Sequence, residues 1–200
     1  MTAVSAVATA PLARFVQALE FLCEQGFRGR EFVRAAEPAM RRLLAEGDFL
    51  PEEAKRPSEG RYARHLLHRD AQDRFVVAAM VWKPGQGTPI HDHDGTWGML
   101  GMLQGGLEVV NYYAEGAELA AGAVPLRSDP PHAPRARHPD CVCACADIHQ
   151  VANKREETAV SIHVYPRDLE KCHVFNPLAG EGGRFEARTV SLSYSDRGPS

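Results

Sequence analysis

The chain has 200 residues, of which 44% are hydrophobic and 24% charged, and its formal net charge is −3. This length suits one domain, and the composition predicts a globular chain with a sizeable core. The small negative charge gives no basic face for nucleic acid or anionic lipid. The longest apolar run, Phe75 to Trp82, is too short to span a bilayer. We therefore expect neither a nucleic-acid partner nor a membrane-bound protein.

The cysteines and the start of the chain predict a cytoplasmic location. There are five cysteines, an odd number, and no Lys or Arg precedes the small apolar residues at the N-terminus. This pattern fits neither a disulfide framework nor an export signal. Cys141, Cys143 and Cys145 have a C-x-C-x-C spacing and no matching second pair, unlike a zinc site. We interpret them as one face of a buried strand.

The first quarter of the chain predicts helices. Hydrophobic residues recur at helical spacing from residue 11 to about residue 50, and Gly26 separates two runs. Pro38 is expected to interrupt the second run. Residues 51–60 form a polar connector. We assign residues 1–60 to an N-terminal tail, a helical cap and this connector.

From Tyr62 onward the hydrophobic period changes to two residues, and turn residues separate short β-rich runs. The expected strands are residues 62–68, 75–82, 97–103, 107–113, 141–149, 159–165 and 189–195. The proline-rich residues 125–139 are interpreted as a surface loop. Many short strands of this kind predict a sandwich or barrel. We expect residues 61–200 to form a mainly β, jelly-roll-like barrel that carries the functional site.

A His-x-His pair is the first candidate for a metal site. His91 and His93 are two residues apart, so on a strand both imidazoles point to the same side. As neutral bases they suit a divalent transition metal, although such a pair alone is also compatible with two core or surface histidines. The context favours a metal, because the spacing resembles that of the first cupin motif. The residues that match this motif are Gly85, His91, His93, Gly98 and Gly105.

A second cupin-like segment supplies a third histidine. His149 and Asn153 match the second motif, although the Pro-x-Gly that often precedes it is absent. Gly98 stands where the first motif has its acidic ligand, so the predicted ligand set contains three histidines and no carboxylate. Such a set leaves the full +2 charge for a substrate anion to offset, which a thiolate does well. Zinc is the competing metal, with Lewis acidity but no redox chemistry.

Polar residues on two further predicted strands complete the candidate site. Ser161, His163 and Tyr165 share one face of their strand, which suits a hydroxyl–imidazole–phenol relay, or a polar face exposed to solvent. Tyr62 and Arg64 share a face of the first strand. An arginine there could clamp a carboxylate through two parallel hydrogen bonds, or simply lie at the surface.

Together these segments resemble the thiol dioxygenase family, and within it the cysteine dioxygenases. The resemblance covers roughly residues 60–180. The matching blocks are Tyr62-x-Arg64, His91-Asp-His93, Leu103-Gln-Gly105, His149-x-Val-x-Asn153, Ser161-x-His-x-Tyr165 and Cys172-His173-x-Phe175. The resemblance implies a single-domain cupin with one Fe(II) per chain. It also implies an oxidoreductase that adds both atoms of O2 to the sulfur of cysteine and produces cysteine sulfinic acid.

The resemblance also implies roles for individual residues. The metal ligands would be His91, His93 and His149. The substrate-binding residues would be Arg64, which pairs with the substrate carboxylate, together with Tyr62 and His173. The catalytic residues would be Tyr165, which orients the bound intermediates, and His163 and Ser161, which fix the tyrosine. No obligate protein partner is evident from the sequence.

Two positions bear on the type of enzyme. Animal members have a cysteine that is crosslinked to the active-site tyrosine, and this chain has Gly98 at the position of that cysteine. Without the crosslink, Tyr165 is expected to act as an ordinary phenol. This pattern looks bacterial. Relatives that oxidise 3-mercaptopropionate usually have glutamine at the position of Arg64 and arginine at that of Val174. Cysteine is therefore the favoured substrate. The alternatives are 3-mercaptopropionate, another small thiol, or a metal-binding cupin without turnover.

Overall fold

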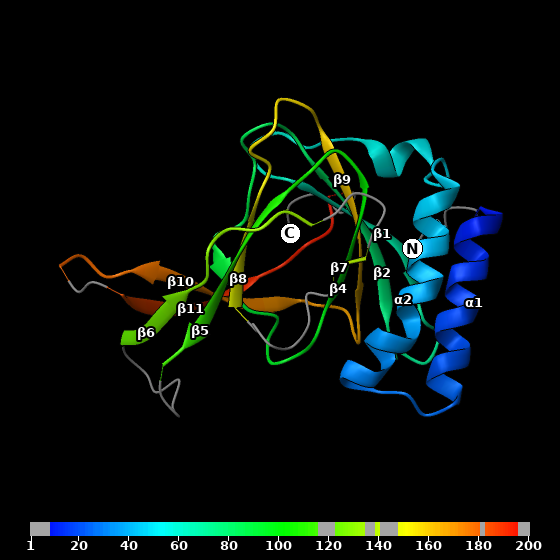
Figure 1. The fold of residues 1–200 in the computed structure, drawn as a ribbon, viewed down its shortest axis with the longest axis horizontal. Helices are drawn as coiled ribbons and strands as arrows, with labels where there is room; N and C mark the ends of the chain where they lie inside the picture. The colour runs from blue at the N-terminus through cyan, green and yellow to red at the C-terminus, as the bar shows by residue number, and fades with distance from the viewer. Residues whose placement is uncertain (1–8, 116–122, 135–138, 141–147, 181–182, 196–200) are drawn as a thin grey trace.

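The computed structural model describes the chain in five segments, residues 9–115, 123–134, 139–140, 148–180 and 183–195. In these segments two helices precede a long series of strands, and the helices lie together on one side of the strands (Figure 1). The predicted architecture, mainly β with an N-terminal helical cap, is confirmed. No helix in the described segments has the length and apolar character needed to cross a membrane.

The helical cap consists of α1 (Ala10–Glu24) and α2 (Gly29–Glu46), followed by the short 3-10 helix η1 (Glu52–Lys55). The prediction that Pro38 interrupts the second helix is wrong, because α2 continues through it. Pro38 lies on the exposed side of α2, where the carbonyl that loses its N–H partner can be solvated. The opposite side of α2 is buried in the core, and this packing stabilises the helix despite the proline.

Five strands form the sheet beneath the helices. In spatial order they are β1 (Ala63–Arg69), β2 (Val76–Trp82), β9 (Ala159–Tyr165), β4 (Met99–Gln104) and β7 (Pro139–Asp140). All neighbouring strands pair antiparallel. The central strands β2 and β9 are buried along their whole length, because one face packs on the helices and the other faces the interior between the sheets.

The remaining strands form a closed barrel-like sheet on the other side of the molecule (Figure 1). In order they are β10 (Lys171–Pro177), β11 (Arg184–Ser191), β6 (Ala123–Ser128), β5 (Glu108–Ala114), β8 (Ile148–Ala152) and β3 (Ile90–His91). The two short strands β3 and β8 pair with each other and face the interior. They carry two of the three predicted metal ligands.

The two-residue period of β9 decides which side chains reach the interior. The residues that pack with the helices are Val160, Ile162 and Val164. The alternate residues, which face the interior, are Ala159, Ser161, His163 and Tyr165. One strand thus contributes to the hydrophobic core with one face and to a polar cavity with the other.

Two of the predictions for the later strands are wrong. The last strand covers residues 184–191 instead of 189–195, and residues 125–139, interpreted as a loop, overlap β6 at their start and β7 at their end. Strand β10 has no counterpart in the prediction. Strands β6, β10 and β11 are partly exposed and interleave charged residues or proline with apolar ones, so their period-two hydrophobic signal is weak.

The predicted strand 141–149 can be followed only at its end. Strand β8 begins at Ile148 and contains the predicted ligand His149. The cysteines Cys141, Cys143 and Cys145 lie outside the described residues.

Candidate metal centre and substrate cavity

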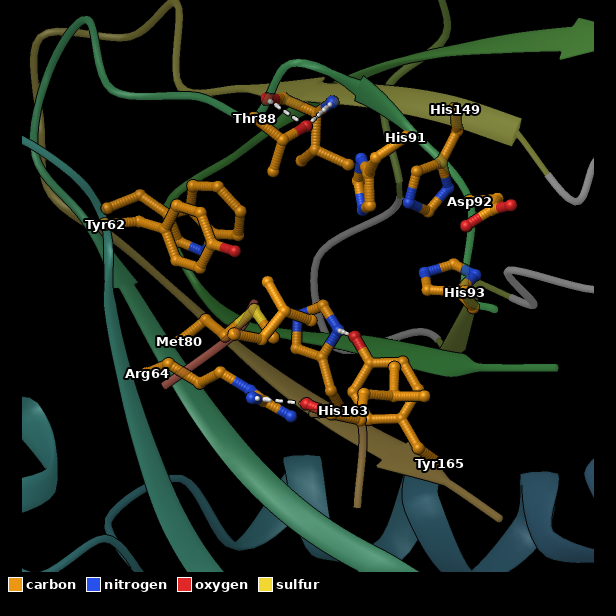
Figure 2. Close-up of a pocket in the computed structure, with 14 residues that line it drawn as sticks. Tyr62, Arg64, Met80, Thr88, His91, Asp92, His93, His149, His163 and Tyr165 are labelled. Carbon is orange, nitrogen blue, oxygen red and sulfur yellow. Dashed lines mark hydrogen bonds between the residues drawn. The ribbon is translucent and has the colours of Figure 1, made fainter. Parts of the chain in front are cut away.

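The three predicted metal ligands lie together in the interior (Figure 2). His91 ends β3 and pairs directly with His149 of β8, so the backbone register brings these two rings to one place. Their ring centroids are 4.6 Å apart, and His93 lies 5.4 Å from His91 and 4.8 Å from His149. One possible ligand atom from each residue can be chosen so that all three lie within 4.8 Å of one another, as a shared ion requires.

The third ligand, His93, follows the end of β3. Directly after it the chain turns through Asp94 and Gly95, which both have positive φ, 52° and 72°. Aspartate tolerates this left-handed conformation because its short polar side chain bonds locally, and glycine adopts it without strain. The turn therefore redirects the chain immediately after the second ligand of the His-x-His pair.

Burial keeps these imidazoles neutral. Loss of hydration lowers the pKa of His91, and it lowers the pKa values of His93 and His149 well below their usual range, with neighbouring imidazoles adding to the effect. In His91, Nδ1 lies 3.1 Å from the carbonyl oxygen of Pro89. A carbonyl only accepts, so Nδ1 carries the hydrogen and Nε2 keeps the lone pair that a metal needs.

The residues present fit a divalent transition metal. Nδ1 of His149 is buried and has no hydrogen-bond partner among the described residues, so this ring is not committed to a structural hydrogen bond there. Gly98 leaves the place of an acidic ligand without a side chain. A Cβ at that position would lie only 2.9 Å from Cε1 of Tyr165, so the tyrosine ring fills the space. The donor set is therefore three neutral imidazoles, a set typical of zinc or iron sites.

Asp92, between the two ligands, anchors this segment to β10. Its Oδ1 accepts hydrogen bonds from the backbone N–H groups of Asp94 and His173, at 3.0 and 2.8 Å. Its Oδ2 lies 2.8 Å from Nδ1 of His173. His173, predicted to bind substrate, is therefore held by Asp92 and is not one of the residues that line the cavity.

Two relay residues of β9, His163 and Tyr165, lie on the opposite wall of the cavity (Figure 2), and Ser161 lies behind them on the same strand. Oγ of Ser161 is 2.8 Å from Nε2 of His163, and Nδ1 of His163 is 3.0 Å from the hydroxyl oxygen of Tyr165. Of the two interpretations offered by the sequence, a relay or an exposed polar face, the geometry fits the relay, because all three residues are buried. The Tyr165 ring also lies 5.5 Å from the His93 ring, beside the candidate metal centre.

Burial sets the charge state of this relay as well. It lowers the pKa of His163 to about 3, with the positive charge of Arg64 as a further cause, and it raises the pKa of Tyr165 far above its ordinary value. The relay is therefore a neutral imidazole and a protonated phenol at any physiological pH. A protonated phenol beside a metal centre can donate a hydrogen bond to an anionic ligand.

Arg64 and Tyr62 form the far end of the cavity. Arg64 is only 4% exposed, and its Nη1 donates to the carbonyl oxygen of Leu169 at 3.1 Å. Its Nη2 is buried and has no hydrogen-bond partner among the described residues, although it forms a long ion pair with Oδ1 of Asp168 at 3.7 Å. Tyr62 stacks on Trp82 with a centroid distance of 4.3 Å. The guanidinium also lies over the Tyr194 ring, 4.2 Å from its centroid, so a cation with incomplete hydrogen bonding stands at this end of the cavity.

Sequence reasoning did not find every residue of the cavity. Met80 and Trp82 of β2 line it, together with Thr88, Leu169 and Leu192. Nε1 of Trp82 donates to Oγ of Ser161 at 2.9 Å, which extends the relay by one member. The period-two pattern of β2 could have placed Trp82 and Met80 on one face, but it could not have told which face meets β9.

Comparisons with known proteins agree with this geometry. The family described as cysteine dioxygenase type I matches residues 58–177. Cysteine dioxygenase type 1 from Danio rerio is 26% identical over 140 residues, which cover 70% of this chain and 67% of the relative. The enzyme from Homo sapiens is 27% identical over 121 residues, which cover 60% of this chain and 58% of the relative. The chain thus spans about three fifths to two thirds of the length of these relatives.

Among solved structures, the protein TT1209 from Thermus thermophilus has a TM-score of 0.43 at 16% identity, with 58% of this chain and 92% of that chain covered. A conserved protein with a double-stranded β-helix domain from Klebsiella pneumoniae has a TM-score of 0.43 at 20% identity, with 60% and 90% covered. The family match covers more than half of the chain, including all three clustered histidines and the relay. The chain therefore belongs to the cysteine dioxygenase type I family, a family of dioxygenases with the cupin fold.

Proposed function

We propose that this protein is an iron-dependent thiol dioxygenase that converts cysteine and O2 to cysteine sulfinic acid. The observation that carries the proposal is one cavity with two complementary ends. Three neutral imidazoles gather at one end, and at the other lies the guanidinium of Arg64, whose Nη2 has no hydrogen-bond partner among the described residues. Both ends line the same cavity.

In this proposal His91, His93 and His149 hold one ferrous ion. When bound, the ion supplies the redox chemistry that O2 needs and a soft centre for a thiolate. Because the three ligands are neutral, they bring no charge to the site, and a thiolate substrate reduces the +2 charge. A metal centre with only three protein ligands keeps open positions for small molecules.

The protein's own residues recognise the rest of the substrate. Arg64 donates from Nη2 to the substrate carboxylate, a contact that also satisfies a buried donor with no hydrogen-bond partner among the described residues. The stacked rings of Tyr62 and Trp82 line the cavity at the same end as Arg64. Tyr165, held by His163, presents its hydroxyl beside the imidazoles and donates a hydrogen bond to oxygen as sulfur is oxidised.

The overall reaction balances without a further reductant. Two electron pairs on sulfur form two S–O bonds, one to each atom of O2, and the O–O bond breaks. Sulfur loses four electrons and O2 gains four. The protein needs no external electron donor, and its residues act by binding, orienting and hydrogen bonding.

Oxygen consumption with three related thiols tests the proposal. Protein loaded with ferrous iron under anaerobic conditions is mixed with cysteine, 3-mercaptopropionate or cysteamine in air-saturated buffer. We expect uptake with cysteine and little with cysteamine, which lacks the carboxylate that Arg64 would bind. Preference for 3-mercaptopropionate would refute the substrate, and no uptake with any thiol would refute the activity. Zinc-loaded protein is the control for redox dependence.

A further inference from the structure

We propose that Trp82 is a positioning residue that fixes the tautomer of His163 and thereby directs the hydroxyl hydrogen of Tyr165 into the cavity. Its consequence for turnover rests on the proposed function, whereas the tautomer itself is a property of the folded chain. The inference starts from the hydrogen bond that the Trp82 indole donates to Ser161. Ser161 belongs to the Ser-x-His-x-Tyr block, whereas Trp82 lies outside it, on β2.

The register of β2 against β9 explains how Trp82 reaches the relay. Trp82 pairs with Ala159, and Met80 pairs with Ser161, so Trp82 and Ser161 are diagonal neighbours on the same face. The large indole spans this diagonal, and its Nε1 comes within 2.9 Å of the serine oxygen. Trp82 is 1% exposed and Ser161 is fully buried, so no bulk water competes for these groups.

The position of each hydrogen follows from which groups can donate. An indole nitrogen can only donate, so Ser161 accepts from Trp82. The hydroxyl hydrogen of Ser161 still needs an acceptor, and Nε2 of His163, at 2.8 Å, is the one that its contacts among the described residues provide. Nε2 therefore carries a lone pair, and the single hydrogen of the neutral imidazole lies on Nδ1.

This tautomer determines what Tyr165 can do. The Nδ1–H of His163 donates to the phenol oxygen at 3.0 Å, so the phenol's own hydrogen is not used in the relay. It remains available to a group in the cavity, which Tyr165 lines beside His93. The relay thus runs in one direction, from Trp82 through Ser161 and His163 to Tyr165.

Without the indole N–H, the direction would no longer be fixed. Ser161 could then accept from Nε2–H of His163, and Nδ1 could accept the hydroxyl hydrogen of Tyr165, which would turn it away from the cavity. With Trp82 in place, that reversed arrangement would give Ser161 two donors and leave its buried hydroxyl hydrogen without an acceptor. Buried polar hydrogens are rarely left unpaired, so the indole excludes the reversed relay.

The closing experiment reads the tautomer directly. We propose nitrogen NMR of 15N-histidine-labelled full chain, with zinc as a diamagnetic occupant of the site, for the wild type, Trp82→Phe and Trp97→Phe. The chain has two tryptophans, and Trp97 packs on Phe32 of α2 in the helix-facing cluster and makes no hydrogen bond to a relay residue, so Trp97→Phe is the matched control. We expect His163 to be protonated on Nδ1 in the wild type and the control, and partly or fully on Nε2 in Trp82→Phe.

A wild type with the hydrogen on Nε2 would overturn the proposal, even if Trp82→Phe failed to fold. An unchanged tautomer in folded Trp82→Phe would do the same. With iron-loaded protein, we expect Trp82→Phe to lower kcat for cysteine about 10- to 100-fold, the usual loss for an outer hydrogen-bond partner at a metal site, with a much smaller change in KM. An unchanged kcat would contradict the positioning role. If the wild type oxidises no thiol, the proposed function fails, but the NMR result still decides the tautomer.

Discussion

The two faces of the five-stranded sheet are made by neighbouring residues of the same strands, yet their chemistry is opposite. On β9, Ile162 packs with the helices in an entirely apolar cluster. Ser161 and His163, on either side of it in sequence, belong to a buried chain of hydrogen bonds on the cavity face. A shift of one residue along the strand therefore separates a core position from a site position.

The difference teaches where stability and chemistry reside in this fold. The helix-facing side removes hydrocarbon from water and needs no exact polar geometry. The cavity side buries imidazoles, a guanidinium and a phenol, groups that cost free energy unless each finds a partner. Substitutions on the first face should change the free energy of unfolding, and substitutions on the second should change metal binding or turnover.

The largest effect is expected from removing a metal ligand on the cavity side. His149→Ala leaves only two clustered imidazoles, so we expect bound iron to fall from about one ion per chain to nearly none and thiol oxidation to become undetectable. Elemental analysis of the purified protein measures the metal. The control is His132→Ala, since His132 is exposed and outside the cluster. Full iron content in His149→Ala would show that the ion binds elsewhere.

The next effect concerns the other end of the cavity. Arg64→Ala should cost about 2–5 kcal/mol of substrate recognition, roughly a 30- to 4,000-fold fall in kcat/KM for cysteine, because a desolvated carboxylate would lose its guanidinium. Steady-state oxygen uptake measures it. The exposed Arg61, replaced by Ala, is the control. An unchanged kcat/KM in Arg64→Ala would remove Arg64 from substrate binding.

On the helix-facing side the readout should be stability. Ile162→Ala truncates a fully buried side chain in the apolar cluster, and we expect the free energy of unfolding to fall by about 2–5 kcal/mol. Urea denaturation measures this, while kcat per folded molecule should stay near the wild-type value. Phe21, 58% exposed on α1, provides the control Phe21→Ala, with a change below about 1 kcal/mol. Loss of kcat without loss of stability in Ile162→Ala would contradict the separation of the two faces.

A smaller and pH-dependent effect is expected at the β1–β2 turn. Asp70 accepts hydrogen bonds from the side chain and backbone of Arg74, which lowers its pKa from 3.8 to about 2. A folded-state pKa below the unfolded one stabilises the fold at neutral pH, and this stability is lost as the pH falls from about 4 to 2. Asp70→Asn should therefore cost about 2 kcal/mol at pH 7 and progressively less toward pH 2.

Urea denaturation across this pH range tests the prediction for Asp70. The control is Glu37→Gln, which removes an exposed helix ion pair with Arg41 and should cost well under 1 kcal/mol. A cost in Asp70→Asn that stays constant down to pH 2 would mean that the carboxylate charge is not its source.

The sequence predicted the parts of the molecule that have strong local patterns. The range 159–165 agrees with β9 at both ends, because the strand alternates regularly and is buried on both faces. The His-x-His spacing brought His91 and His93 together, and His149 joined them through the β3–β8 register. The continuity of α2 through Pro38 depended on tertiary packing that local helix signals do not contain.

Other features depended on contacts between distant segments. His173 is held by Asp92, which lies 81 positions away in sequence, and no local signal indicates this pair. The contact of Trp82 with Ser161 requires the β2–β9 register, since the sequence alone does not say which strands are neighbours. Strands β6, β10 and β11 are partly exposed, so hydrophobic periodicity marked them poorly.

The most direct test of the proposed chemistry is the fate of the oxygen atoms. Cysteine is incubated with iron-loaded protein under 18O2, and the product is analysed by mass spectrometry. The account predicts a sulfinic acid in which both new oxygen atoms are 18O. Unlabelled cystine as the product, or a sulfinic acid with oxygen derived from water, would contradict it.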